Sequence, residues 1–384
     1  MRTGVATIPL DYGKCPPWLF ERMKRLSRII ALIIIEEWGT EEFLKRLSDP
    51  VWFQSLGCLI GFDWNSSGLT TTSLGALKEG LRGLEKDWGI FVCGGKGKTS
   101  RKTPEQIERW AELLNFSKER ANSLIKASRL SAKVDSSLLQ DGYQLYHHNF
   151  IFDQKGNWIV IQQGMKIENK SARRYHWLSF KVKDFTREPH SGIASDQFFS
   201  HLNLVSRESE KNKNISLDLA TKEPKNFLRD LRLILEKSDR LIRQKRLFHF
   251  CQVELKDVEF HWHPVLKEKF DLKRLKETIE KIHFFSPQDF ESLLSLPGVG
   301  PKTIRALSLV SEVIYGAKAS FEDPARYSFN VGGKDGTPYF VKRKIYDQLL
   351  EILEKISRKS YFSFSEKKEL KGKSLFLRKV FKKP

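Results

Sequence analysis

Apolar residues recur at every third or fourth position along several stretches of this chain, and this spacing predicts amphipathic helices. The first stretch covers residues 17–38, and a short helix is predicted to follow over residues 41–47. Further helices are predicted over residues 72–84, 104–115, 118–132, 226–246, 272–283, 287–294, 301–315 and 341–356. The helical pattern is therefore strong in both halves of the chain.

Strand patterns are confined to the first half of the chain. Residues 89–93 predict a short strand. The apolar runs 150–152 and 158–161 flank the turn-forming residues 153–157, which is typical of a β-hairpin. One more strand is predicted over residues 173–180.

The polar residues 183–225 indicate a connector with some local helix between two unlike halves. We therefore predict an α+β protein with a mixed domain over residues 1–200, which holds a β-hairpin or small sheet. An all-helical domain with a helix-hairpin-helix is predicted over residues 225–357. Residues 358–384 carry ten Lys or Arg and two acids, which predicts a flexible basic tail that binds phosphates.

The most specific local signal is Leu-Pro-Gly-Val-Gly-Pro-Lys-Thr at residues 296–303. Ser286 and Pro287 are predicted to start the helix before it, and Pro301 the helix after it. A turn this tight aims unpaired backbone N–H groups at a phosphate from a helix N-terminus. The predicted DNA-backbone contacts are Gly298, Val299, Gly300 and Thr303. Both glycines also permit a positive φ.

The composition favours the same class of partner. Lys and Arg number 67 against 47 Asp and Glu, a net charge of +20, and such a surplus favours nucleic acid over an anionic membrane surface. Double-stranded DNA with a flipped base is the predicted partner, and RNA stays open. The longest apolar run, Ile29–Ile35, is far shorter than the ~20 residues of a membrane span. The four cysteines lie too far apart for a zinc ribbon, and a cytoplasmic protein with reduced thiols is expected.

A glycine-rich segment at residues 94–100 looks superficially like a phosphate-binding P-loop. Val92 stands where that motif needs its first glycine, so a nucleoside triphosphatase is not predicted. Lys96 and Lys98 suit contacts to backbone phosphates, or equally a mobile basic turn. Lys334, in a second glycine-rich loop, is predicted to contact the DNA backbone near the 296–303 segment, or to lie in an exposed turn.

Arg173-Arg174-Tyr175-His176-Trp177 interleaves cations with aromatic rings. Such a face can hold phosphates and stack on bases, so Arg173 and Arg174 are candidate DNA contacts. Strand alternation would place Arg174 and His176 on one side and the other three residues on the opposite side. The competing interpretation is an edge strand whose aromatic residues pack inward.

Three histidines on neighbouring predicted strands, His147, His148 and His176, are possible metal ligands. No acidic cluster with clear spacing accompanies them, and the sequence predicts no metal and no cofactor. A metal-dependent DNA nuclease in the N-terminal domain is kept as an alternative function. Its candidate acids are Asp63, Asp141 and Asp153.

The 296–303 segment resembles the motif of endonuclease III-like DNA glycosylases, with Lys302 at the position of their nucleophile. The resemblance implies that this lysine attacks C1′ of a damaged nucleotide, displaces the base and forms a Schiff base that allows strand cleavage. Asp323, after the second helix, matches the aspartate that assists. The chain is then a DNA repair enzyme, a glycosylase with AP-lyase activity. If the segment only binds the backbone, the chain is a non-catalytic DNA-binding module.

Distinctive blocks recur along the whole chain, at residues 56–58, 61–64, 66–72, 92–98, 162–165, 172–177 and 332–336. On these blocks, the chain from residue 4 to about residue 353 resembles a domain-of-unknown-function family of archaea and thermophilic bacteria. That resemblance implies no activity.

Overall fold

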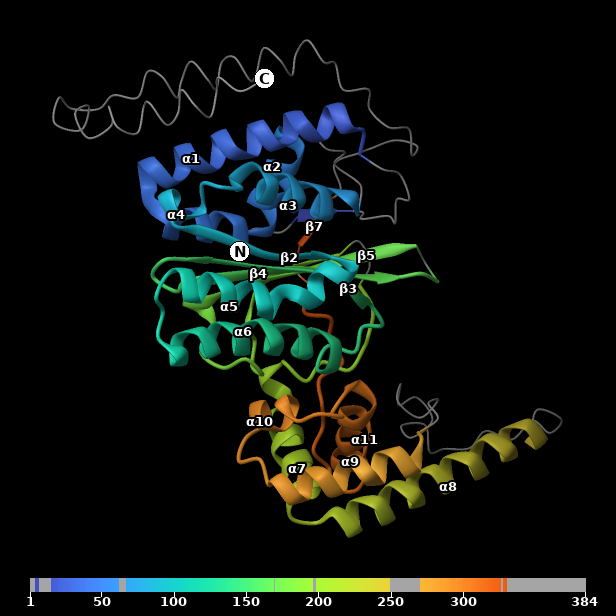
Figure 1. The fold of residues 1–384 in the computed structure, drawn as a ribbon. Helices are drawn as coiled ribbons and strands as arrows, with labels where there is room; N and C mark the ends of the chain where they lie inside the picture. The colour runs from blue at the N-terminus through green and yellow to red at the C-terminus, as the bar shows by residue number, and fades with distance from the viewer. Residues whose placement is uncertain are drawn as a thin grey trace, which may run out of the picture.

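A computed structural model describes residues 4–6, 15–61, 67–168, 170–195, 198–248, 270–325 and 327–329, with the backbone alone for residues 4–6, 238–248 and 327–329. A central β-sheet has helices on both faces, and a further group of helices stands beyond one of these helical layers (Figure 1). The mixture of helices and strands confirms the predicted α+β class.

Within the described residues the sheet has seven strands, in the order β1-β7-β6-β5-β4-β3-β2. They are β1 (Gly4–Ala6), β2 (Ile90–Lys96), β3 (Gln144–Asp153), β4 (Trp158–Lys166), β5 (Ser171–Leu178), β6 (His190–Ala194) and β7 (Tyr327–Phe329). Strands β2 to β6 pair antiparallel, whereas β7 pairs parallel with β1 and β6. The β3–β4 hairpin is the predicted one, with Phe152 opposite Trp158. β5 lies in the middle of the sheet, so its interpretation as an edge strand was wrong.

The upper face of the sheet is covered by the first helices of the chain (Figure 1). They are α1 (Pro17–Ser48), α2 (Pro50–Leu59), α3 (Gly68–Leu81) and the short α4 (Glu85–Trp88). Gly39 has φ 86° inside α1, so this helix is kinked where the sequence predicted a break. The apolar stripes of these helices pack on inward-facing strand residues such as Val92, Ile151 and Ile159.

The lower face is covered by two helices that follow β2. They are α5 (Thr103–Leu113) and α6 (Lys118–Ser137), preceded by the 3₁₀ helix η1 (Gly97–Lys102). Ser117 caps α6 by accepting a hydrogen bond from the N–H of Arg120 (3.2 Å). Phe91, Phe150 and Phe152 face these helices, because alternate residues of a strand point to opposite faces.

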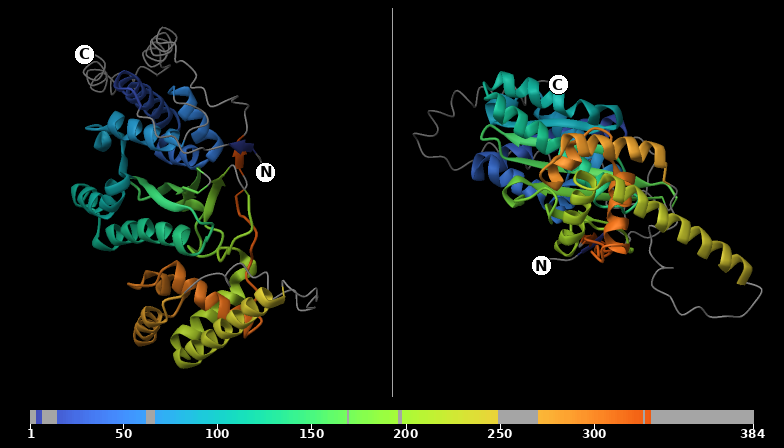
Figure 2. Two further views of the ribbon diagram at one scale, coloured as in Figure 1. Left: turned by 90° about the vertical axis from the view of Figure 1, so that its right-hand side faces the viewer. Right: turned by 90° about the horizontal axis from the view of Figure 1, so that it is seen from below.

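The remaining helices pack beyond α6, and α8 extends past the others (Figures 1 and 2). They are α7 (Glu210–Thr221), α8 (Pro224–Phe248), α9 (Leu272–Phe285), α10 (Phe290–Ser295) and α11 (Pro301–Val313). α7 packs against the other four helices of the group, so the local helix expected in this segment is part of the helical group rather than of a connector. Its buried positions are polar and apolar in turn: Leu219 and Ala220 join the core, and Asn212 donates to the carbonyls of Ser308 (3.0 Å) and Ala317 (2.7 Å). The buried polar positions interrupt the apolar stripe in its sequence.

The chain returns from these helices to the sheet. Ser320 bridges to Asn203, which bridges to Leu139, and β7 then enters the sheet between β1 and β6. One apolar core continues from Phe150 on the sheet to Leu307 on α11. This core and β7 both cross the boundary that the sequence placed between residues 200 and 225.

Two short 3₁₀ helices, η2 (Ser179–Lys181) and η3 (Arg207–Ser209), complete the described elements. In the described part of the chain, no helix has the length and apolar character needed to cross a membrane. The helix predicted over residues 341–356 and the basic tail 358–384 lie outside the described residues.

Candidate nucleic-acid interface

The α10–α11 turn, residues 296–300, reverses the chain by local interactions. Asp289 caps α10 by accepting a hydrogen bond from the N–H of Ser292 (2.6 Å). Gly298 takes φ +90°, a conformation that glycine adopts at the lowest cost. α11 starts at Pro301 as predicted, because proline lacks the N–H that the first helical residue leaves unused. Gly300 has φ −144°, so it does not use the positive φ that a glycine permits.

The N-terminus of α11 carries no side-chain cap, since Gly300 is its N-cap residue. The first N–H groups of a helix lack intrahelical partners and form the positive end of its dipole. Lys302 is exposed in this first turn, whereas the side chains of Val299 and Thr303 are buried. This helix end is therefore suited to an anion, which Thr303 can approach only with its backbone. The N–H of Val299 already donates to the carbonyl of Leu296 (3.3 Å).

Two other helices fix the α10–α11 turn in place. Lys133 of α6 donates a hydrogen bond to the carbonyl of Val299. Gln140, just beyond α6, donates to the carbonyl of the first α11 residue (2.9 Å). On α9, the Oγ1 of Thr278 would lie 3.7 Å from a Cβ added at Gly298. The turn is thus held against rigid elements rather than on a loose loop.

Cations surround the α10–α11 turn. On α6, Arg129 and Lys126 lie one and two helical turns before Lys133, on the same face. Thr278 on α9 has one exposed cation a turn before it and another a turn after it. The exposed cations beside the turn are Lys126, Arg129, Arg274, Lys281 and Lys302. Glu291 of α10 pairs with Lys126 (2.5 Å), and the balance favours a polyanion.

Asp323, predicted to assist Lys302, is bound elsewhere. Its carboxylate accepts hydrogen bonds from both terminal nitrogens of Arg173 on β5 (2.6 and 3.2 Å). It also accepts from the backbone N–H groups of Phe199 (3.3 Å) and Ala325 (2.9 Å). Within the described residues, Lys302 is not among its partners. Asp323 therefore fastens the segment after α11 to the sheet.

Arg173 is fully buried at the centre of an ion cluster. Its guanidinium also donates to Asp141 (3.1 Å) and lies close to the rings of Tyr143 (4.9 Å) and Phe199 (5.3 Å). Burial raises the pKa of the Asp141 carboxyl, and the Arg173 cation acts against that rise. Contrary to the prediction, Arg173 is not presented to a DNA backbone.

Arg174 points to the opposite face of β5, as the alternation requires. It donates to the Oε1 of Gln54 (2.8 Å), the Oγ1 of Thr70 (3.2 Å) and the Nε2 of His176 (2.9 Å). No carboxylate of the described residues pairs with it, and burial lowers its pKa to about 9. At 1% exposure, Arg174 is closed to DNA as well, so this prediction also needs correction.

Lys96 and Lys98 are exposed at the end of β2 and in η1. The Nζ of Lys96 lies 5.9 Å from the centre of the Tyr146 ring. The loop after β2 folds as a short 3₁₀ helix, so it is not a P-loop followed directly by an α-helix. Both lysines are open to a phosphate. Lys334 lies outside the described residues.

The candidate metal ligands do not come together. His148 bonds to Ser128 (2.9 Å) and Gln162 (2.8 Å) on the lower face. His147 points to the upper face, where neither ring nitrogen has a hydrogen-bond partner among the described residues, and His176 accepts from Arg174. No group of three metal-ligating side chains occurs in the part of the chain that the structure describes.

The candidate nuclease acids have separate structural partners. Asp141 belongs to the Arg173 cluster. Asp153 closes the β3–β4 turn by accepting from the N–H groups of Lys155 and Asn157 (2.9 Å each). Asp63 lies outside the described residues.

Sequence reasoning missed a buried polar network on the lower face. Asp135 of α6 accepts hydrogen bonds from Gln162 and from the Nε1 of Trp177 (3.0 Å), and it pairs with His190 (2.5 Å). The available signal was an acid at helical spacing between Ser131 and the buried Leu138. Two exposed aromatic residues at the end of α9, Phe284 and Phe285, were also missed.

A search among curated proteins and a search among solved structures each return no match. A family model matches residues 4–341, which include every described strand and all helices from α1 to α11. The chain therefore belongs to the family described as protein of unknown function (DUF763).

Proposed function

We propose that this chain binds the sugar–phosphate backbone of double-stranded DNA, with the α10–α11 turn acting as a helix-hairpin-helix. The observation that carries the proposal is the uncapped N-terminus of α11, held rigidly and surrounded by exposed cations. A bound phosphate satisfies the first N–H groups of the helix and gains from its dipole, by up to about 2 kcal/mol in a partly buried geometry. The expected cytoplasmic location fits this function.

The N-cap position of α11 offers a test that does not disturb the fold. A Cβ at Gly300 meets no atom within 4 Å, and φ −144° suits any residue. Asp and Asn are both good N-cap residues, so both variants should keep the stability of the parent. Gly300→Asp puts a carboxylate in the phosphate seat, whereas Gly300→Asn is a neutral control of the same size.

Affinity for a 20-base-pair duplex is measured by fluorescence anisotropy between 50 and 200 mM salt. We expect Gly300→Asp to bind at least about tenfold more weakly than Gly300→Asn, because a like charge replaces an attraction. Lys302→Ala should reduce the salt slope by about 0.9, the loss of one phosphate contact. Equal duplex affinity of the wild type and Gly300→Asp would refute the proposal.

A DNA glycosylase with AP-lyase activity is the second candidate function. It is favoured by Lys302, an exposed amine in the first turn of α11. Borohydride trapping on a duplex with an abasic site tests it, since a Schiff base becomes a stable cross-link on reduction. We expect the wild type and Lys281→Ala to cross-link and Lys302→Ala to fail. An absence of cross-link in the wild type would leave backbone binding alone.

A further inference from the structure

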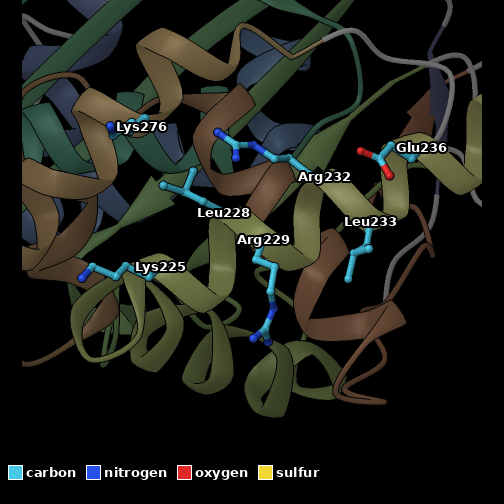
Figure 3. A pocket seen from close by; sticks show the side chains of 7 residues that line it. All are labelled: Lys225, Leu228, Arg229, Arg232, Leu233, Glu236 and Lys276. Atoms are coloured by element: carbon cyan, nitrogen blue, oxygen red, sulfur yellow. The ribbon is translucent and has the colours of Figure 1, made fainter.

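A basic groove lies between α8 and α9, away from the α10–α11 turn. Its volume is about 390 Å³, and its lining residues are Lys225, Leu228, Arg229, Arg232, Leu233, Glu236 and Lys276 (Figure 3). Lys276 precedes Thr278 by two residues, so the two side chains leave α9 in nearly opposite directions. Thr278 contacts the turn, and the groove is therefore a separate surface.

The lining of this α8–α9 groove suits an anion that has an apolar body. Four cations face one acid, Glu236, and the half-buried Leu228 and the exposed Leu233 provide apolar surface between them. Arg229 also pairs with Asp230 (2.9 Å), and Lys276 lies 3.7 Å from Glu280. The Lys276–Glu280 pair is exposed, and exposed pairs contribute little energy, whereas the Asp230 carboxylate is buried and holds the guanidinium of Arg229. Lys225, Arg232 and Lys276 are therefore the cations that stay available to phosphates.

Two aromatic rings stand in solvent at the end of α9. Phe284 is 81% exposed and Phe285 is 60% exposed, and their ring centres lie 5.3 Å apart in an edge-to-face arrangement. Phe284 follows Lys276 by eight residues, about 12 Å along the helix and on the same broad face. His283 bonds to the carbonyl of Thr221, which fixes this end of α9 beside the start of α8. Exposed aromatic residues beside a basic groove indicate a binding surface.

We propose that the α8–α9 groove and the Phe284–Phe285 pair bind an unpaired nucleic-acid strand. The cations take its phosphates, and the two rings stack on its bases. A combination of a positive groove with exposed aromatic rings is the physical basis of single-strand binding. A duplex does not fit this arrangement, because its base faces are covered by their neighbours in the stack. The groove thus has a ligand different from that of the α10–α11 turn.

The test uses the full chain and a fluorescent 15-residue oligothymidine, with affinity measured by anisotropy. The double variant Phe284→Ala/Phe285→Ala should bind roughly 5- to 150-fold more weakly for each stack lost, with an unchanged salt slope. Arg232→Gln with Lys225→Gln should lower the salt slope by about 1.4, which is two phosphates of a single strand. Leu113→Ala, an apolar side chain on α5 that is 45% exposed, is the control and should bind like the wild type.

All substituted side chains are at the surface, and thermal melting confirms that each variant is folded. Gly300→Asp should keep its oligothymidine affinity while it loses duplex affinity. If the chain binds oligothymidine but no duplex, the proposed duplex binding is refuted, whereas single-strand binding by the α8–α9 groove is supported. Three results would overturn the inference. The first is an unchanged oligothymidine affinity of the Phe284→Ala/Phe285→Ala variant, and the second is a loss of both duplex and oligothymidine affinity in Gly300→Asp. The third is binding to phosphatidylserine vesicles without binding to oligothymidine.

Discussion

The role of Asp323 can be decided by one isosteric substitution, Asp323→Asn. In the structure this carboxylate is 7% exposed and accepts hydrogen bonds from both terminal nitrogens of the fully buried Arg173. Breaking a buried ion pair by removing one partner costs about 3–5 kcal/mol. Asp141 remains 3.1 Å from the same guanidinium, and the asparagine oxygen can still accept one hydrogen bond. We therefore expect a loss of about 2–3 kcal/mol in the free energy of unfolding.

This loss should lower the melting temperature by about 2–4 °C for a chain of this size. Urea unfolding followed by circular dichroism gives the free energy, and a thermal scan gives the midpoint. Glu322→Gln is the matched control, because that neighbouring acid is exposed and its neutralisation should change stability by less than about 0.5 kcal/mol.

The same variant separates a structural role from a catalytic one. If Asp323 fastens the sheet to the segment after α11, Asp323→Asn destabilises the fold. If Asp323→Asn instead melts like the wild type and abolishes borohydride trapping on an abasic duplex, the carboxylate is an electrostatic partner of Lys302. That result would refute the reasoning from the Arg173 cluster.

Three further outcomes follow from the structure. Burial lowers the pKa of His147 from 6.5 to about 3, so below pH 6.5 the unfolded chain gains a proton that the folded chain does not. Stability should then fall by about 2 kcal/mol from pH 7 to pH 5, and urea unfolding of His147→Gln should show a shallower fall; equal slopes would contradict this. Gly298→Ala, at φ +90°, should lose about 1 kcal/mol or more. Gly300→Ala, whose added Cβ lies in open space, should lose less free energy of unfolding than Gly298→Ala. If Gly300→Ala melts at the lower temperature of the two, the φ of +90° at Gly298 is wrong. Burial raises the pKa of Cys93 to about 12, so this thiol should not react with iodoacetamide at pH 8 until urea unfolds the chain. Peptide mass spectrometry measures the labelling, and rapid labelling of the folded chain would contradict the burial of Cys93.

Features that depend on neighbouring residues were predictable from the sequence. Ser117 caps α6 as its residue type indicates. The β3–β4 hairpin forms around the predicted turn, and Pro301 starts α11. Each of these depends on a few adjacent residues, so the local pattern contains the physical cause.

Where two capping residues lie close together, local chemistry did not decide between them. Ser286 was expected to start the helix before the turn. It instead ends α9 with φ 43°, and Asp289 caps α10. Serine and aspartate are equally good N-caps, and the longer apolar stripe of α9, through Ile279 and Ile282, settles the boundary.

The positions of Arg173 and Arg174 could not be read from the sequence, because charged residues are normally exposed. Arg173 is buried because Asp141 and Asp323 meet it from segments 32 and 150 residues away. Arg174 is buried among neutral acceptors from α2, α3 and β5. Only the topology places β5 in the middle of the sheet with helices over both faces, so neither burial has a local signal.

The buried charges show how much of the net charge of +20 lies at the surface. Among the described residues, the buried charged side chains are Asp135, Asp141, Asp153, Asp230, Arg173, Arg174 and Lys213. The interior of this part therefore holds four acids against three bases, so burial does not reduce the positive surplus at the surface. A polyanion can bind only to the exposed cations. Those beside the N-terminus of α11 come from α6, α9 and α11, and those in the α8–α9 groove come from α8 and α9. The phosphate contacts that we propose therefore lie on α6, α8, α9 and α11, whereas the arginines of β5 maintain the fold.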